Sequence, residues 1–170
     1  MRVIVCALPC LAICCLPILA QGTLAKADQQ FLDMAAQTDM TEAHLGQMAA
    51  DQAANSAVKD YAQTLVADHT SDYTQLGTLA TKAGGTIPKG IDAQHEKMIA
   101  PFHKLKAAQF DQRYIHEMVA GHTKAIAAYK AEAANGENAD VKAYAGQALP
   151  TLEKHLEGAK DLMKSKAKSK

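Results

Sequence analysis

The sequence predicts an all-α protein built as a four-helix bundle, and three observations support this. From Asp28 onward the chain is rich in Ala, Gln, Lys, Glu, Met and Leu, which favour helices, and no alternating strand pattern occurs. Four long segments repeat apolar residues every three or four positions. Helix-breaking residues separate these segments at 55–56, 84–90 and 135–136. We therefore expect four helices that each bury one apolar face.

The four expected helices cover residues 28–52, 56–82, 109–134 and 139–163. Each has roughly 25 residues and is therefore about 37 Å long. Short connections inside each pair predict two antiparallel hairpins. The connection 83–108 is long enough to cross the bundle and contains a short helix after Asp92. The expected topology is up-down-down-up with one long crossover.

The first 27 residues have a different composition from the helical region. The charge of Arg2 precedes an apolar run at 3–20, and Ala25-Lys26-Ala27 fits an A-x-A processing site. This pattern predicts a secretory signal peptide over residues 1–27, and thus a periplasmic or secreted protein. The alternative is an uncleaved membrane anchor, although two prolines interrupt the apolar run.

Charge and cysteine content limit the chemistry of the predicted mature chain. The 170 residues include 18 Lys+Arg and 18 Asp+Glu, and all four cysteines lie within the predicted signal peptide. Without Arg2 and Lys26 the formal charge is 16 − 18 = −2. The absence of cysteine excludes disulfides, thiolate metal sites and a cysteine nucleophile from the mature chain. We do not expect a nucleic-acid partner, because no basic cluster occurs outside the C-terminal end.

The remaining domain boundaries follow from the helices. The predicted bundle domain covers 28–163, and residues 164–170 are expected to form a Lys-rich flexible tail. This tail is a frayed helix end in one interpretation and makes weak contact with an anionic envelope surface in the other. Val58-Lys59-x-Tyr61-Ala62 recurs as Val141-Lys142-x-Tyr144-Ala145, which favours a duplicated hairpin.

Each apolar stripe is interrupted near its middle by a residue that can bind a metal. The four residues are Glu42, His69, His122 and His155. In an antiparallel bundle they lie within about one to two helical turns of one level. Imidazole and carboxylate ligands suit a divalent cation such as Zn, Fe, Mn or Cu. The sequence therefore predicts a metal site formed by these four side chains.

Other polar residues are candidates for supporting this layer. Asp68, Glu117 and Asp111 are predicted as further ligands or as carboxylates that orient the imidazoles. Tyr61 and Tyr114 are candidate hydrogen-bond partners of the histidines. The remaining histidines are expected to be solvated: His44, His95, His103 and His116.

The layer also has a metal-free interpretation. Glu42 would then pair with a protonated histidine or with tyrosine hydroxyls, and the polar layer would fix the register of the helices.

Several short motifs together resemble a known family. They are Phe31, Glu42-x2-Leu45-Gly46-x-Met48-Ala49, Val58-Lys59-x-Tyr61-Ala62, Asp68-His69, Phe110-Asp111-x2-Tyr114-x7-His122 and Leu149-Pro150-x-Leu152-x2-His155-Leu156. They resemble the ferritin-like domain of unknown function of small bacterial proteins often labelled outer-membrane or exported proteins. The resemblance implies a ferritin-like bundle, export to the periplasm, and Glu42, Asp68, His69, His122 and His155 as the characteristic positions.

The resemblance implies no activity. The residues three positions before His69, His122 and His155 are Val66, Val119 and Leu152, so the paired Glu-x-x-His motifs of di-iron ferritins are absent. We expect an exported, stress- or envelope-related bundle that binds a transition-metal ion at its Glu/His layer. One alternative is a metal-dependent redox enzyme acting on oxygen or peroxide species. The other is a metal-free structural protein that self-associates as a homo-oligomer or binds an envelope partner.

Overall fold

A computed structural model describes residues 23–168, which are helical apart from their connections and contain no strand. The helices are α1 (Lys26–Gln52), α2 (Ser56–Lys82), α3 (Ala93–Ile99), the 3-10 helix η1 (Ala100–Lys104), α4 (Ala107–Asn135) and α5 (Ala139–Lys168). Within the described range no helix is long and apolar enough to cross a membrane. Residues 1–22 of the predicted signal peptide lie outside the described residues.

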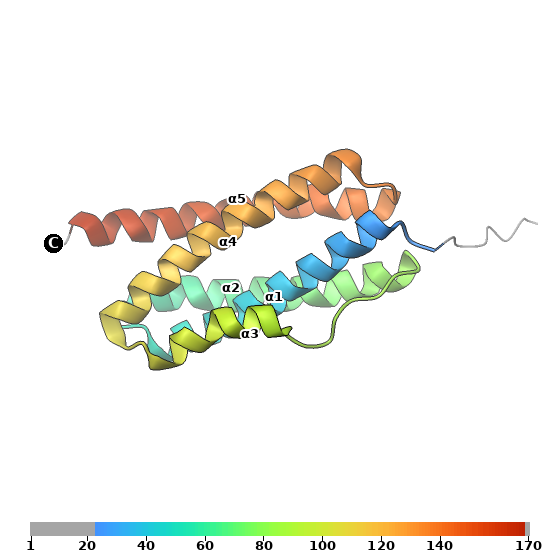
Figure 1. Ribbon diagram of the computed structural model, residues 1–170. Helices are drawn as coiled ribbons and strands as arrows, with labels where there is room; N and C mark the ends of the chain where they lie inside the picture. Colours follow the sequence, from blue (N-terminus) through green and yellow to red (C-terminus); the bar gives the residue numbers. More distant parts are fainter. Residues whose placement is uncertain (1–22, 169–170) are drawn as a thin grey trace, which may run out of the picture.

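The long helices form two antiparallel hairpins, α1 with α2 and α4 with α5 (Figure 1). The hairpins meet through α1 against α4 and α2 against α5. Asp28, near the start of α1, accepts hydrogen bonds from the backbone N–H groups of residues 137 and 138. Asp111, near the start of α4, accepts them from residues 54 and 55. α1 and α4 are therefore antiparallel, which confirms the predicted up-down-down-up topology and its single crossover.

Side-chain caps explain where three of the helices begin. Asn55 accepts a hydrogen bond from the backbone N–H of Ala57 at 2.8 Å. Asp92 accepts two at the start of α3, and Asn138 accepts two at the start of α5. Each cap satisfies backbone donors that lack a partner within the helix. After α2, Gly84 has a φ of 77°, a conformation that glycine adopts without strain.

The helix ends differ from the predicted ones mainly at the C-terminus. α1 begins at Lys26, two residues before the predicted domain boundary. α5 continues to Lys168, so the backbone is helical over most of the segment 164–170 that was expected to form a flexible tail. In Figure 1 this last part of α5 extends beyond the neighbouring helices.

The core consists of two apolar clusters. One contains Leu45, Leu65, Phe102, Phe110 and Tyr114, with the ring of Phe102 from η1 lying 5.7 Å from that of Phe110. The other contains Phe31, Leu76, Ile126, Tyr129 and Val141. Five buried polar residues lie between the clusters: Asp39, Glu42, His69, His122 and His155. The bundle therefore places a buried polar layer between two apolar halves.

Equivalent contacts in the two hairpins support the predicted duplication. The hydroxyl of Tyr61 donates to the backbone oxygen of His155 at 3.0 Å, and that of Tyr144 donates to Asp72 at 2.7 Å. The same separation along the chain relates Tyr61 to Tyr144 and Asp72 to His155. Each hairpin therefore donates a tyrosine hydroxyl to an equivalent position of the other, to a backbone oxygen in one case and to a carboxylate in the other.

Candidate metal centre

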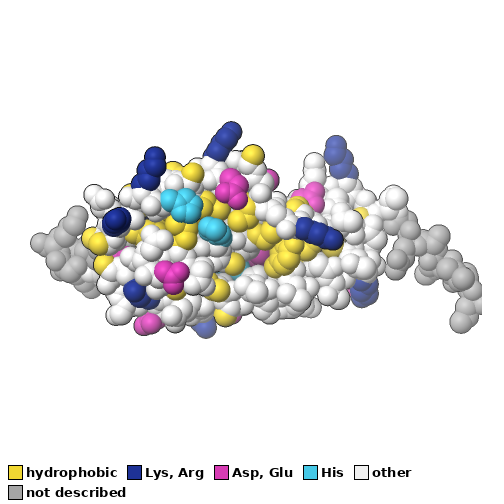
Figure 2. All heavy atoms as spheres, turned by 90° about the horizontal axis from the view of Figure 1, so that it is seen from below, with side chains coloured by type: hydrophobic (Ala, Val, Ile, Leu, Met, Phe, Trp, Pro, Cys, Tyr) yellow, Lys and Arg dark blue, Asp and Glu magenta, His cyan; other side chains and the backbone are white. Residues whose placement is uncertain are grey.

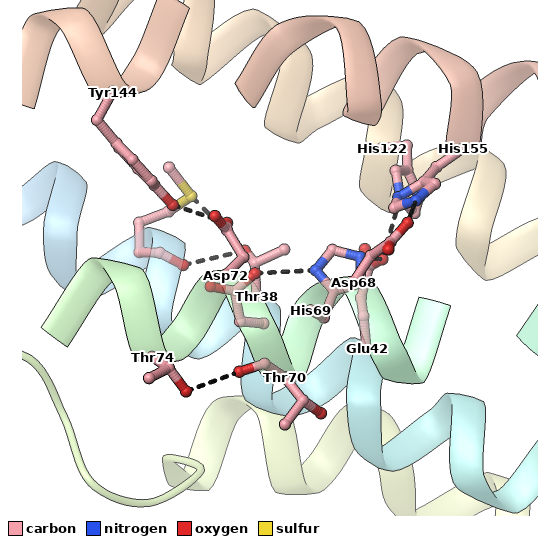
Figure 3. A network of polar contacts seen from close by, with 12 residues as sticks. Thr38, Glu42, Asp68, His69, Thr70, Asp72, Thr74, His122, Tyr144 and His155 are labelled. Atoms are coloured by element: carbon pink, nitrogen blue, oxygen red, sulfur yellow. Dashed lines mark hydrogen bonds and ion pairs between the residues drawn. The ribbon is translucent and has the colours of Figure 1, made fainter. Parts of the chain in front are cut away.

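Each long helix contributes one side chain to the polar layer (Figure 3). Glu42 comes from α1, His69 from α2, His122 from α4 and His155 from α5. None of these four side chains is more than 6% exposed. One nitrogen from each of the three imidazoles lies within 4.8 Å of the other two. The structure therefore brings the four residues predicted from the sequence to one level of the core.

Glu42 lies directly against two of the histidines. Its Oε2 atom is 3.0 Å from His69 Nε2 and 3.2 Å from His122 Nε2. Ring centroids in the histidine cluster are separated by 5.2 to 5.7 Å. The carboxylate and the imidazoles thus form one compact group.

The nitrogen of each imidazole that faces away from this group meets a hydrogen-bond acceptor. His69 Nδ1 lies 2.8 Å from Asp39, and His155 Nε2 lies 2.8 Å from Asp68. His122 Nδ1 lies 2.9 Å from the backbone oxygen of Met118. An acceptor requires a proton on the nitrogen that it faces, so in a neutral ring the other nitrogen carries a lone pair.

The atoms that face inward have no partner outside the layer itself. His155 Nδ1 is buried and has no hydrogen-bond partner among the described residues, whereas His69 Nε2 and His122 Nε2 lie against only the Glu42 carboxylate. Buried polar atoms without partners are uncommon in native proteins and call for a specific explanation. One unpartnered imidazole nitrogen, two that face only Glu42, and the Glu42 oxygen itself form a donor set suited to a cation.

Electrostatics differ among the members of the layer. Burial lowers the pKa of His69, but the charge of Glu42 and the hydrogen bonds to Asp39 and Glu42 outweigh burial and raise it to about 10. Burial raises the pKa of Glu42, but the imidazoles of His122 and His69 outweigh burial, so this pKa lies below its usual value. Without a metal, His69 is therefore an imidazolium between two carboxyl groups at neutral pH.

The other two histidines remain neutral. Burial lowers the pKa of His122 and of His155, in spite of the raising effects of Glu42 and Asp68. Burial raises the pKa of Asp39 to about 7, against the lowering effect of His69. His122 and His155 are thus already in the protonation state that a metal ligand needs.

The residues predicted to support the layer have different outcomes. Asp68 contacts His155 as expected, with a side chain that is 44% exposed. Glu117 lies 3.6 Å from Arg113, and its role as a supporting carboxylate stays a prediction. The interpretation of Asp111 was wrong, because it binds the α1–α2 turn at the end of the bundle. Tyr61 binds the backbone of His155 rather than its ring.

Sequence reasoning missed Asp39. This residue is only 1% exposed and is the hydrogen-bond partner of His69. Its position three residues before Glu42 places both carboxylates on one face of α1. That spacing was the signal by which Asp39 could have been found.

Comparison with known proteins gives a family and a fold. The profile of a family described as a domain of unknown function, DUF4142, matches residues 15–162. Comparison with curated proteins finds no match. A DUF305 fragment from Deinococcus radiodurans has a similar structure, with a TM-score of 0.73 and 14% identity over 85% of this chain and 99% of that chain.

Two solved structures of CopM are also similar. The Ag-bound form has a TM-score of 0.66 at 16% identity, and the Cu(II)-bound form has 0.64 at 15%. Each match covers 81% of this chain and 96% of CopM. At these identities the likeness shows a shared helical-bundle fold.

Proposed function

The chain belongs to the DUF4142 family of unknown function, and we propose that it binds one divalent transition-metal ion through Glu42, His69, His122 and His155. The observation that carries this proposal is the orientation of the three imidazoles. Each has its outer nitrogen bound to an acceptor, and no inner nitrogen has a partner outside the layer itself. Histidine ligands in metal sites are held in this way, because the outer contact fixes both tautomer and ring orientation.

The spacing of the ligand atoms supports a small cation. In a tetrahedral site with metal-to-nitrogen distances near 2.0–2.1 Å, neighbouring ligand atoms are about 3.3 Å apart. Glu42 Oε2 lies 3.0 and 3.2 Å from two imidazole nitrogens, close to this value. The imidazole nitrogens lie within 4.8 Å of one another, so only small movements are needed to close the site.

The ligand types favour zinc or copper among the candidates, with iron and manganese next. Imidazole suits Zn, Cu, Fe and Ni, whereas Mn prefers oxygen ligands. CopM, which shares the fold of this chain, was solved with Ag and with Cu(II) bound. That fact supports copper as one of the first two ions to test.

Binding is better supported than redox catalysis on oxygen or peroxide. Three imidazoles and one carboxylate complete a four-coordinate site, and sites without an open position are typical of structural or storage roles. All four side chains are almost completely buried. A bound ion would lie deep in the bundle and link all four long helices.

The metal-free layer is a competing role for the same residues. The His69 imidazolium then lies between Asp39 and Glu42 and joins α2 to α1. The imidazolium carries a proton on Nε2, the nitrogen whose lone pair would bind a metal. Metal and proton therefore exclude each other at His69. The two roles therefore differ in a measurable way, which is the metal content.

Metal analysis of the protein purified without a histidine tag tests the proposal. We expect one ion per chain and a melting temperature that falls when a chelator is added, because the ion stabilises only the folded state. Replacing His69→Ala together with His155→Ala should remove the ion. The matched control, His95→Ala with His103→Ala, should retain it. Much less than one ion per chain, or retention by the first double variant, would contradict the proposal.

We also propose that the protein is exported and acts in the cell envelope. The charged start, apolar run and processing site within residues 1–27 support this. Mass spectrometry of the protein from the periplasmic or secreted fraction should find a chain that begins after the apolar run. A chain that retains residues 3–20 in every fraction would contradict export by cleavage.

A further inference from the structure

A large groove runs along the bundle between α1, α4 and the crossover. Its volume is about 940 Å³, at the upper end of the range of small-molecule sites. α1 and α4 form its walls, and residues 86–98 of the crossover border it. Figure 2 views the side of the molecule on which α3 lies and shows hydrophobic side chains along the long axis, with charged and histidine side chains around them. Of the five residues of the polar layer, Glu42 alone also lines this groove.

Much of the groove surface is apolar and adaptable. Met34, Met98 and Met118 line it from three different elements, together with Leu45 and Ile87. Methionine side chains are flexible and polarisable, so they fit apolar bodies of various shapes. The lining therefore suits the hydrocarbon part of a ligand.

The charges in the groove are mostly negative. Four carboxylates line it: Asp33, Glu42, Asp92 and Glu117. Lys124 is the one lysine or arginine in the same lining, and His95 lies 2.8 Å from Asp92. Glu42 also faces the His69 imidazolium and Glu117 lies 3.6 Å from Arg113, but carboxylates still outnumber basic side chains within the lining. This excess favours a cationic ligand over an anionic one.

Thr41 provides an independent indication of a ligand. This residue lines the groove, is only 1% exposed, and its hydroxyl has no hydrogen-bond partner among the described residues. Other helical threonines donate to the carbonyl oxygen four residues earlier: Thr38, Thr64, Thr74, Thr78, Thr81 and Thr123. The buried hydroxyl of Thr41 thus lacks the partner that these threonines have, on a residue that borders the groove.

Small residues form part of the groove wall on α4. Ala120, Gly121 and Ala128 line the groove on α4. A Cβ atom at position 121 would lie 3.0 Å from Glu42 Oε1, so glycine leaves room beside the carboxylate. Thr41 and Glu42 are adjacent in sequence and both line the groove. The Thr41 hydroxyl and the Glu42 carboxylate together form a polar patch in a mainly apolar groove.

We propose that this groove binds a small amphipathic organic cation. The apolar body of the ligand lies against the methionine side chains, and its ammonium group donates hydrogen bonds to the Thr41 hydroxyl and the Glu42 carboxylate. Charge complementarity identifies the class of ligand, and the unpartnered hydroxyl identifies the polar end of the site. This role goes beyond metal binding but shares Glu42 with it, because Glu42 Oε2 faces the imidazoles and Oε1 lies beside Gly121.

Isothermal titration calorimetry with decylammonium tests the proposal, with decanoate as a probe of equal chain length and opposite charge. We expect the wild type to bind decylammonium at least about tenfold more tightly than decanoate, as expected for one charge-assisted hydrogen bond. Ala128→Phe fills the groove and should abolish binding. Ala127→Phe, at an exposed neighbouring position outside the lining, should not. Equal or tighter binding of decanoate, no binding of decylammonium, or equal binding by both variants would overturn the proposal.

A second pair of variants tests the polar end without changing the shape of the groove. Thr41→Val should weaken decylammonium binding by about tenfold. Thr123→Val, at an exposed threonine on α4, should leave it unchanged. Equal affinities in these two variants would contradict the assignment of Thr41.

The double variant His69→Ala/His155→Ala separates this proposal from metal binding. It should lose the metal and still bind decylammonium, whereas Ala128→Phe should lose decylammonium and keep the metal. If decylammonium binding is lost together with the metal in the double variant, the groove is not an independent site.

Discussion

Glu42→Gln should strongly destabilise the metal-free protein, because it removes the charge facing the His69 imidazolium. The two groups are 3.0 Å apart, and both side chains are at most 6% exposed. At an effective dielectric constant of 20, such a pair attracts by about 5 kcal/mol. Breaking a buried pair on one side costs about 3–5 kcal/mol, a large part of the total stability of about 5–15 kcal/mol of a typical protein. Glutamine preserves the shape of the side chain, so the loss reports the charge.

The pKa values of Glu42 and His69 determine how the stability lost in Glu42→Gln depends on pH. Glu42 has a pKa lowered from 4.5 in the folded state, so its contribution is present above pH 4.5 and is lost as the pH falls further. His69 has a pKa raised from 6.5 to about 10, so its contribution is full below pH 6.5 and is lost as the pH rises towards 10. The difference between wild type and Glu42→Gln should therefore be largest between pH 4.5 and 6.5.

Urea unfolding in the presence of a chelator measures this difference. Glu157→Gln, at an exposed carboxylate of α5, is the matched control and should change the free energy of unfolding by less than about 0.5 kcal/mol. If Glu42→Gln is within about 1 kcal/mol of the wild type at pH 6, or if its effect grows towards pH 10, the ionic pairing of His69 with Glu42 is refuted.

Three further predictions concern the surroundings of the layer. Asp68→Asn should weaken metal binding by about 10–100-fold, because the His155 ring loses its charged acceptor. The control Asp60→Asn, on the same helix, should not weaken it. Equal affinities of the two variants in a metal titration would contradict this prediction. Metal binding at pH 8 should release about one proton, which comes from His69. Calorimetry in buffers of different ionisation enthalpy measures the number of protons released. Release of no proton would show that His69 is neutral without metal. Burial and the charge of Asp28 raise the pKa of Glu132 from 4.5 to about 7, so the folded state holds a proton that the unfolded state has lost. Stability should therefore fall as the pH rises from 4.5 to 7, and Glu132→Gln should remove this fall in urea unfolding; an unchanged profile would refute the assignment.

The level of the polar layer was predictable because helix geometry converts residue counts into distances. Glu42, His69, His122 and His155 lie near the middle of helices whose ends are marked by caps and breakers such as Asn55 and Asn138. Periodicity also identified the buried face of each helix. These local signals were enough to give the topology and the four candidate ligands.

The partners of these ligands were less predictable, because they depend on the rotation of each helix against its neighbours. His122 uses the backbone oxygen of Met118, which no side-chain pattern reveals. Asp39 was overlooked because a stripe with one residue per turn assigned only Glu42 to the core face of α1. The groove depends on the path of residues 86–98, a connection without a hydrophobic period.

Anomalous X-ray scattering from crystals of the metal-loaded protein shows whether the ion occupies the polar layer. Data collected on both sides of the absorption edge of the added ion, zinc or copper, locate that ion without assumptions about its ligands. We expect one strong peak inside the bundle, in contact with Glu42, His69, His122 and His155. A peak at His95 or His103 alone, or no peak within the layer, would contradict it.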